Sequence, residues 1–230
     1  MADGEGILRS RGMEFPDDPA IIDSDIRKAL RRDIYEDREA HAVSRKVKKS
    51  DIVMELGAGI GYMSTLSAKV CGAQAVHTYE ANPGLIPYIR RVHRLNGVSN
   101  VELNNALLGP EAGEATFYVR DNILASSMDP DPKGEEAKIV ETHQIEVRSI
   151  ADEMRRIKPT ALIVDIEGAE AHVLPHADLS TVRLVVIELH PQWIGEAGTR
   201  AVFETMMKAG LTYFPWPSAK KVVVFMKDWD

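Results

Sequence analysis

Three alternating glycines at positions 57, 59 and 61 constrain the fold of this chain more than any other feature. They follow an apolar run at 52–54, which is typical of a strand buried on both faces, and they precede 64–70, which is typical of a short helix. Glycine has no Cβ, so the backbone amides of such a loop can approach a ligand closely. This order predicts a nucleotide-type site at the carboxyl end of the first strand of a parallel sheet.

The spacing of the glycines indicates which kind of nucleotide binds. A dinucleotide fingerprint needs a glycine at position 62, where this chain has Tyr62, and this argues against a nicotinamide dehydrogenase. The glycines, with Glu55 before them, instead resemble motif I of class I S-adenosylmethionine (SAM) methyltransferases. Glu80 ends the next apolar strand, about 20 residues past the glycines, and we expect it to accept hydrogen bonds from two ribose hydroxyls.

Length and composition bound the class of protein. A chain of 230 residues suits one α/β domain, and no apolar run is long enough to span a membrane. Cys71 is the only cysteine, which favours a reducing, cytoplasmic compartment. The net charge of −7 argues against a nucleic-acid partner. We expect a flexible tail over 1–22 and a single domain over 23–230 that begins with a helical extension at 23–49. The sequence is compatible with a homo-oligomer and does not decide the oligomeric state.

Two later apolar strands end in residues that can carry out acid–base chemistry. The run 161–164 leads into Asp165, and the run 184–187 leads into Glu188 and His190. The carboxyl ends of parallel strands meet at one edge of a sheet, and alternation along a strand places Glu188 and His190 on one face. We therefore expect Asp165 to face these two side chains.

The remaining pattern completes a doubly wound α/β fold. A third strand at 101–103 leads to Asn105 and Ala106 at the same edge, where an amide could reach the adenine or its ribose. Strands at 117–119 and 145–147 could pair across the loop 129–134 as an acceptor-recognition insert, with Ser126 and Ser127 helping to close the cofactor pocket. Strands at 211–214 and 222–226 predict a final antiparallel hairpin. We expect a mostly parallel, seven-stranded, Rossmann-like sheet with N-terminal helices.

Several segments, taken in order, resemble the FkbM family of SAM-dependent methyltransferases. They are 35–36, 55–62, 79–83, 105–107, 165–170 and 188–190, and the likeness runs from about Tyr35 to Met226. The segment 165–170, Asp-Ile-Glu-Gly-Ala-Glu, is the most distinctive. One departure is Ile163, where the family often has lysine.

The resemblance implies SAM as the cofactor and S-adenosylhomocysteine as the product. Members of the family are mostly O-methyltransferases that act on hydroxyls of polyketides, sugars and other secondary metabolites, so a small-molecule acceptor is expected. The residues expected to contact the cofactor are Glu55, Gly57, Gly59, Gly61, Tyr62, Glu80, Ala81, Asn82, Asn105, Ala106, Ser127 and Asp165.

The predicted chemistry is alignment of an acceptor lone pair with the methyl group and removal of the acceptor proton. His190 is the first candidate for general base, Asp165 is the alternative base or its orienting partner, and Glu188 could serve either role. In a competing interpretation, the same three residues bind Mg²⁺, which would acidify the acceptor hydroxyl. In a third, the two carboxylates bind cofactor or backbone amides without proton transfer.

Two other functions remain open from the sequence. One is N-methylation of a small amine, although 165–168 is not the Asn/Asp-Pro-Pro-Tyr/Phe segment of nucleobase and protein amide N-methyltransferases. The other is a non-catalytic SAM-binding partner or sensor. The acids and the imidazole at the later strand ends favour catalysis.

Overall fold

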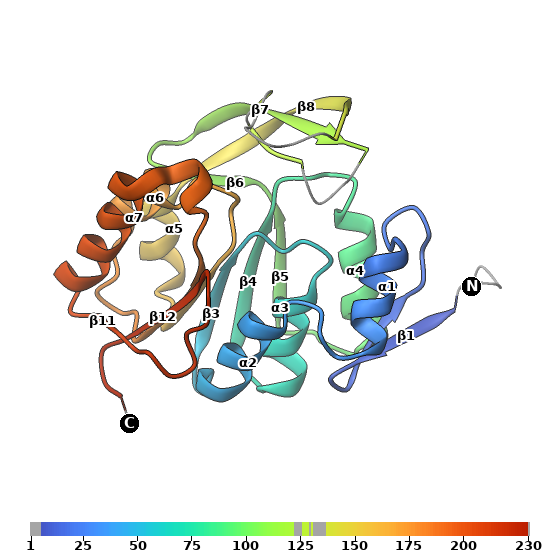
Figure 1. Ribbon diagram of the computed structural model, residues 1–230, viewed down its shortest axis with the longest axis horizontal. Helices are drawn as coiled ribbons and strands as arrows, with labels where there is room; N and C mark the ends of the chain where they lie inside the picture. The colour runs from blue at the N-terminus through green and yellow to red at the C-terminus, as the bar shows by residue number, and fades with distance from the viewer. Residues whose placement is uncertain (1–5, 122–125, 129, 131–136, 230) are drawn as a thin grey trace.

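The central element of the protein is a seven-stranded β-sheet (Figure 1), seen in a computed structural model that describes residues 6–121, 126–128, 130 and 137–229. Its strands lie in the order β11-β12-β10-β9-β3-β4-β5. All neighbours pair in parallel except at β12, which is antiparallel to β10 and β11. The strands are β3 (Ile52–Leu56), β4 (Ala75–Glu80), β5 (Val101–Asn105), β9 (Ala161–Val164), β10 (Leu184–Glu188), β11 (Thr212–Tyr213) and β12 (Val222–Met226). The predicted doubly wound fold with a C-terminal antiparallel hairpin is confirmed.

The chain reverses its direction across the sheet at β3. It adds β4 and β5 on one side of β3 and then returns to add β9 and β10 on the other side. Ligands of doubly wound sheets bind beyond the carboxyl ends of the strands at such a reversal. The glycine loop after β3 and Asp165 after β9 meet there, and the Asp165 amide donates to the Leu56 carbonyl at 2.9 Å.

Helices cover both faces of the sheet because its central strands are apolar on both faces. One layer packs against Val53, Ile163 and Val186, and the other packs against Met54, Leu162 and Val185. The first layer contains α1 (Ser24–Arg31), α2 (Asp37–Lys46), α3 (Tyr62–Thr65) with the π-helix η1 (Leu66–Val70), and α4 (Ile86–Leu95). The second contains α5 (Ile150–Ile157), α6 (Glu170–Val173) with the 3₁₀ turn η3 (Leu174–His176), and α7 (Pro191–Lys208).

The prediction of a flexible tail over 1–22 is wrong for the residues described. Strands β1 (Ile7–Ser10) and β2 (Met13–Pro16) form an antiparallel hairpin, and both Met13 and Phe15 are fully buried. Arg11 and Gly12 have φ angles of 47° and 78°, and two adjacent positive φ values are typical of a tight type I′ hairpin turn. The alternation of apolar and polar residues around Arg-Gly was the signal for this hairpin. Residues 1–5 of the predicted tail lie outside the described part.

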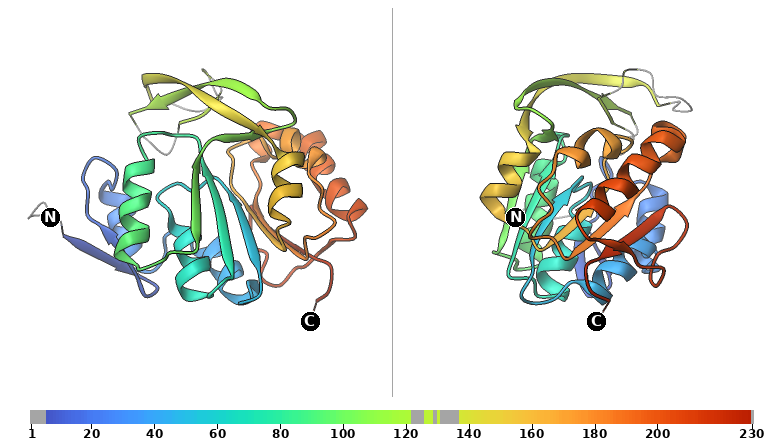
Figure 2. Two further views of the ribbon diagram at one scale, coloured as in Figure 1. Left: turned by 180° about the vertical axis from the view of Figure 1, so that it is seen from behind. Right: turned by 90° about the vertical axis from the view of Figure 1, so that its left-hand side faces the viewer.

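A second, three-stranded sheet lies across the end of the main sheet where β5 finishes (Figures 1 and 2). It consists of β6 (Leu107–Gly109), β7 (Gly113–Arg120) and β8 (Ile139–Ser149), in the order β6-β8-β7. The predicted pairing of 117–119 with the strand that contains 145–147 is confirmed, with Phe117 opposite His143. Phe117, Val119 and Ile145 pack on Ala81, which directly follows Glu80. We call this sheet the roof. Most of the predicted loop 129–134 lies outside the described residues.

The described helices include none that is both long enough and apolar enough to cross a membrane. The longest, α7, contains a break at Gly195, where φ is 63°. Its first turn follows directly on β10, so His190 and Trp193 lie at the carboxyl edge of the main sheet.

Candidate active site

The glycine loop is shaped by its contact with the strand end beside it. A Cβ added to Gly57 would lie 1.8 Å from the carbonyl oxygen of Asp165, closer than any two such atoms can approach, and Gly57 has a φ of 88°. Gly59 also has a positive φ, 53°, but nothing lies within 4 Å of its Cβ position. Gly57 is therefore required for the close approach to Asp165, and Gly59 leaves open space beside the loop amides.

Glu80 binds the same loop through its side chain. One carboxylate oxygen accepts a hydrogen bond from the Gly59 amide at 2.9 Å, and the other accepts from the Asn82 amide at 2.7 Å. Burial raises the pKa of Glu80 to about 7, although these backbone hydrogen bonds act in the opposite direction. The acid predicted to bind the ribose is thus held at the glycine loop, where each oxygen can still accept a further hydrogen bond.

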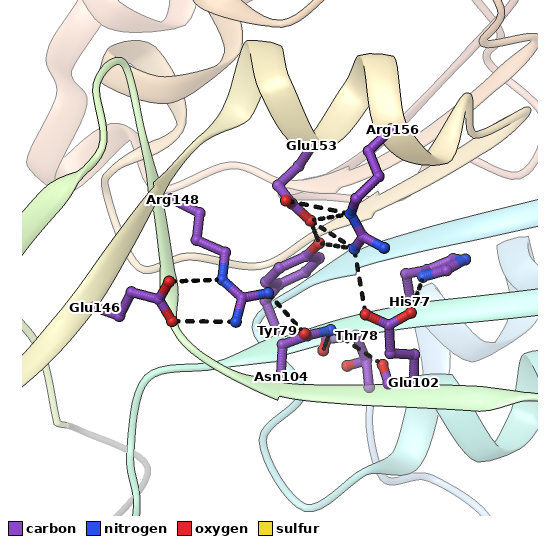
Figure 3. Close-up of polar contacts among 9 residues, drawn as sticks. All are labelled: His77, Thr78, Tyr79, Glu102, Asn104, Glu146, Arg148, Glu153 and Arg156. Atoms are coloured by element: carbon purple, nitrogen blue, oxygen red, sulfur yellow. Dashed lines mark hydrogen bonds and ion pairs between the residues drawn. The ribbon is translucent and has the colours of Figure 1, made fainter.

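A polar network behind β4 supports this arrangement (Figure 3). The Tyr79 carbonyl accepts hydrogen bonds from the Gly57 and Ala58 amides at 3.0 and 3.1 Å. The Tyr79 phenol binds Glu153 of α5, and Arg156 of α5 pairs with Glu153 at 2.7 Å. A neighbouring guanidinium, that of Arg148 in β8, pairs with Glu146 and donates to Asn104 of β5 at 2.8 Å. Hydrogen bonds therefore connect β4, the strand that carries Glu80, to α5, and they connect the roof to β5.

Glu55 is the buried acid of the loop. It is 1 % exposed, and its neighbours Thr78 and Ser64 only partly offset the cost of its burial. Burial raises its pKa to about 8. A buried carboxyl group is costly to ionise, and a positively charged ligand at the loop would offset that cost. Together with the open space beside Gly59, this acid fits a cofactor that carries positive charge.

Three of the other residues predicted to contact the cofactor lie at the turn after β4. Asn105 and Asn82 shape the turn after β4: the Asn105 amide donates to the Glu80 and Ala81 carbonyls at 2.9 and 3.0 Å, and the Asn82 side chain accepts from Gly84 at 3.0 Å. Ala81 lies at the same turn, under the roof.

The Tyr62 side chain lies differently from what we expected, whereas the cofactor contacts of Ala106 and Ser127 stay predictions. The Tyr62 ring is 1 % exposed, stacks on Phe15 at 5.3 Å, and its hydroxyl bonds to Ser10 at 2.9 Å, so it belongs to the core beneath the N-terminal hairpin. Ala106 is buried in the opposite core layer. Ser127 pairs with Tyr118 of the roof through backbone hydrogen bonds. Gly61, which precedes Tyr62, fits against Ile89 of α4, where an added Cβ would lie 2.9 Å from a side-chain methyl.

His190 is held on both ring nitrogens by carboxylates. Its Nδ1 lies 2.7 Å from Glu170, and its Nε2 lies 3.1 Å from Glu167 and 3.8 Å from Asp165. Trp193 stacks on the ring with the centroids 5.0 Å apart. Burial by itself would lower the pKa of His190, but the hydrogen bonds to Glu167 and Glu170 outweigh it and raise the pKa to about 10.

Asp165, Glu188 and His190 come together as predicted. One ligand atom from each lies within 4.8 Å of the others. Burial, followed by repulsion from Glu167 and Glu188, raises the pKa of Asp165 well above its ordinary value, and the charge of His190 opposes this. Burial also raises the pKa of Glu39, on α2, to about 7, and the neighbouring Glu188 adds to the effect. The carboxyl ends of β9 and β10, which we call the mouth of the site, therefore bring several carboxyl groups together around one imidazole.

Glu167, Glu170 and Trp193 received no catalytic or cofactor-binding role from sequence reasoning. Glu170 is fully buried, and its contact sets the orientation of His190. The signal for both acids was present in the spacing of the segment 165–170, whose acids at positions 167 and 170 surround one imidazole. Their pairing with His190, twenty residues or more along the chain, could be seen only in the folded protein.

The fold and the site define a class of protein. A doubly wound sheet whose first strand ends in a glycine loop, with an acid from the next strand hydrogen-bonded to that loop, is the arrangement of class I SAM-dependent methyltransferases. The chain belongs to the FkbM methyltransferase domain family, whose model matches residues 55–230. The predicted resemblance to this family of SAM-dependent methyltransferases is confirmed.

Similar proteins agree with this assignment. Over 87 residues the chain is 39% identical to ribosomal protein L11 methyltransferase of Bacillus subtilis (strain 168), a match that covers 36% of this chain and 27% of that protein. Precorrin-6y C5,15-methyltransferase of Geobacter metallireducens GS-15 has a similar structure, with a TM-score of 0.50, 12% identity, and coverage of 84% of this chain and 88% of that one. TYW2 of M. jannaschii, solved in complex with AdoMet, gives a TM-score of 0.50 at 16% identity, covering 96% and 84%. At these identities the structural likeness shows the fold alone.

Proposed function

We propose that this protein methylates a hydroxyl group of a small metabolite such as a polyketide or a sugar. Membership of the FkbM family supports this class of acceptor, because the resemblance implies O-methylation of such hydroxyls. The acidic mouth and the net charge of −7 argue against a polyanionic acceptor such as nucleic acid. Cys71 is the only cysteine of the chain, which supports a reducing, cytoplasmic compartment.

One observation carries the proposal. The main chain of Asp165 presses on Gly57, so the strand end that bears an acid–base group touches the cofactor loop directly. Bound SAM supplies a methyl group on a positively charged sulfur, and Glu55, the loop amides and Glu80 are the groups of this chain that would hold it. An acceptor placed at the carboxyl ends of β9 and β10 would then lie next to both the donor and the acids.

The proton of the acceptor hydroxyl needs a base with a free lone pair. His190 was the first candidate, but both of its ring nitrogens already face carboxylates, at 2.7 and 3.1 Å. Asp165 has a buried oxygen with no hydrogen-bond partner among the described residues. We therefore assign the base to Asp165, with His190 as the group that orients it and Glu188 as a neighbouring acid. In the balanced reaction the O–CH₃ bond forms, the S–CH₃ bond breaks with its electron pair left on sulfur, and the hydroxyl proton passes to the carboxylate.

The test is methyl transfer from labelled SAM to a panel of hydroxylated metabolites and matched primary amines. We expect label on the hydroxyl compounds, and a loss of about 10²-fold to 10⁴-fold in rate for Asp165→Asn with SAM affinity kept. Glu204→Gln, a carboxyl-to-amide change at an exposed position of α7, is the matched control and should keep the full rate.

Label found on amines alone would replace O-methylation by N-methylation. SAM binding without transfer to any compound of a broad panel would favour a sensor or partner protein instead.

A further inference from the structure

The carboxyl ends of β9 and β10 carry a set of donors suited to a metal ion. Asp165, Glu188 and His190 each present one ligand atom, and these three atoms lie within 4.8 Å of one another. We propose that this cluster binds a divalent cation of the Mg²⁺ and Mn²⁺ class, which would hold the acceptor hydroxyl. The proposal deepens the methyl transfer proposed above, and its catalytic purpose rests on that function.

The imidazole is already oriented as a metal ligand. Its Nδ1 donates to Glu170 at 2.7 Å, and the Glu170 side chain is fully buried. A histidine whose one nitrogen donates to a carboxylate presents the lone pair of the other nitrogen, and this is the usual support of a metal-bound histidine. The stack with Trp193 fixes the plane of the ring. Nε2 therefore points at the Asp165 and Glu167 carboxylates, at 3.8 and 3.1 Å, with a defined direction.

The carboxyl groups around His190 outnumber the positively charged side chain that faces them. The Asp165 oxygen nearest His190 is buried without a hydrogen-bond partner among the described residues, although its side chain is one-third exposed. Glu188, which is half-exposed, interacts with a buried acid, Glu39 of α2. Glu167 adds a further carboxylate on the solvent side. In the metal-free protein a single imidazolium balances one of these charges, and a divalent cation bound to the neutral imidazole would balance two instead.

The chemistry of the donors selects the class of ion. Two carboxylates and one imidazole form a mainly oxygen set, and the only cysteine of the chain, Cys71, lies near Val43 on a different face of the sheet. Oxygen donors favour Mg²⁺ and Mn²⁺, and an added imidazole moves the preference towards Mn²⁺. Three protein ligands leave about half of an octahedral shell for water and the acceptor oxygen.

A cation at this position would act on the acceptor and not on the methyl donor. A hydroxyl bound to it would be more acidic, so its proton would pass more readily to a carboxylate of the cluster. Coordination of Nε2 requires a neutral imidazole and displaces Glu167, whose side chain is 42% exposed. Because Asp165 would then be a metal ligand, Glu167 would take the acceptor proton in place of Asp165. The methyl step itself stays as written above: the hydroxyl oxygen gains the methyl group and sulfur keeps the electron pair.

The experiment is a titration of the full chain with Mn²⁺, followed by electron paramagnetic resonance of the free ion and by calorimetry, without SAM or acceptor present. We expect one site in the wild-type protein. Asp165→Asn and His190→Ala should abolish it, and Glu170→Gln should weaken it by about 10-fold to 100-fold because Glu170 acts through His190. Glu204→Gln should bind as the wild type does.

Two further measurements separate this proposal from the proposed function. Glu188→Gln changes a half-exposed ligand at a strand end, so circular dichroism should show that it folds even if a buried variant does not. SAM affinity and methyl transfer are measured in the presence of chelator and after Mn²⁺ is restored. Absent Mn²⁺ binding, or binding that is equal in wild type and the Asp165 and Glu188 variants, overturns the metal site. Methyl transfer that then persists in chelator leaves the proposed function intact.

Discussion

The affinity for SAM should depend on pH through Glu80. The Glu80 carboxylate accepts hydrogen bonds from the Gly59 and Asn82 amides, and we expect it to accept two more from the ribose of the cofactor. Only the ionised form can accept all of them, and burial raises the pKa of this group to about 7. Lowering the pH through 7 therefore protonates Glu80 and weakens binding, and above pH 8 the contribution of Glu80 no longer changes.

The magnitude follows from the ionised fraction. A group with a pKa of about 7 is about nine-tenths ionised at pH 8 and about one-tenth ionised at pH 6, so the dissociation constant for SAM should rise about 10-fold over this range. Glu80→Gln removes this titrating group, so the pH dependence that remains should be that of Glu55, whose pKa is about 8. Because it also removes a charged acceptor from two ribose hydrogen bonds, we expect affinity at pH 8 to fall by about 10-fold to 100-fold.

The assay is isothermal titration of SAM between pH 6 and 8.5 in the presence of chelator. Glu39 has a similar pKa, about 7, but lies on α2 at the acceptor side, so Glu39→Gln should keep the pH dependence of the wild type. A flat profile for the wild type between pH 6 and 8, or a Glu80→Gln profile identical to that of the wild type, would refute the assignment of Glu80 to the ribose.

Three further predictions concern the fold around the site. Burial lowers the pKa of His93 from 6.5 to about 4, so the unfolded chain takes up the proton first. The free energy of unfolding should therefore fall by up to about 3 kcal/mol as the pH drops from 6.5 to 4. Urea unfolding measures this loss, and an equal loss in His93→Gln would contradict the assignment. Gly57→Ala puts a Cβ 1.8 Å from the Asp165 carbonyl oxygen at a φ of 88°. Calorimetry should therefore find SAM binding lost, and thermal unfolding should show that the free energy of unfolding falls by at least about 1 kcal/mol. Unchanged SAM affinity would mean that the loop backbone can move away from Asp165 without harm to the site. Phe15→Ala should lower the free energy of unfolding by about 3–5 kcal/mol in chemical denaturation, because the ring is fully buried and stacks on Tyr62. A decrease below about 1 kcal/mol would mean that the hairpin does not pack stably on the domain.

The sequence was most informative where local rules are sufficient. Strand β3, its glycine loop and the helix after it follow one another within 20 residues, and Glu80 ends the next strand, so spacing alone indicated the cofactor class. The parallel sheet could be predicted because its strands are apolar runs without alternation, which need helices on both faces.

The errors arise where a side chain had a tertiary partner that spacing does not reveal. Tyr62 stands directly after the glycine loop, yet its ring turns away to stack on Phe15, more than 40 residues earlier. That stack depends on the β1–β2 hairpin, whose strands have only four residues each. Strands this short are hard to identify from sequence, so the region was predicted to be a tail. The hairpin was identifiable only from its Arg-Gly turn.

By itself, the sequence determined the fold, the cofactor and the meeting of three acid–base residues at one edge, because strand order and the direction of parallel strands decide which ends come together. Only the tertiary structure decided the state of those residues. The charge on His190 depends on Glu167 and Glu170 at 3.1 and 2.7 Å, and the burial of Asp165 depends on the elements packed around it. Ionisation responds to distances of a few ångströms and to exclusion of water, and neither quantity is encoded in local spacing.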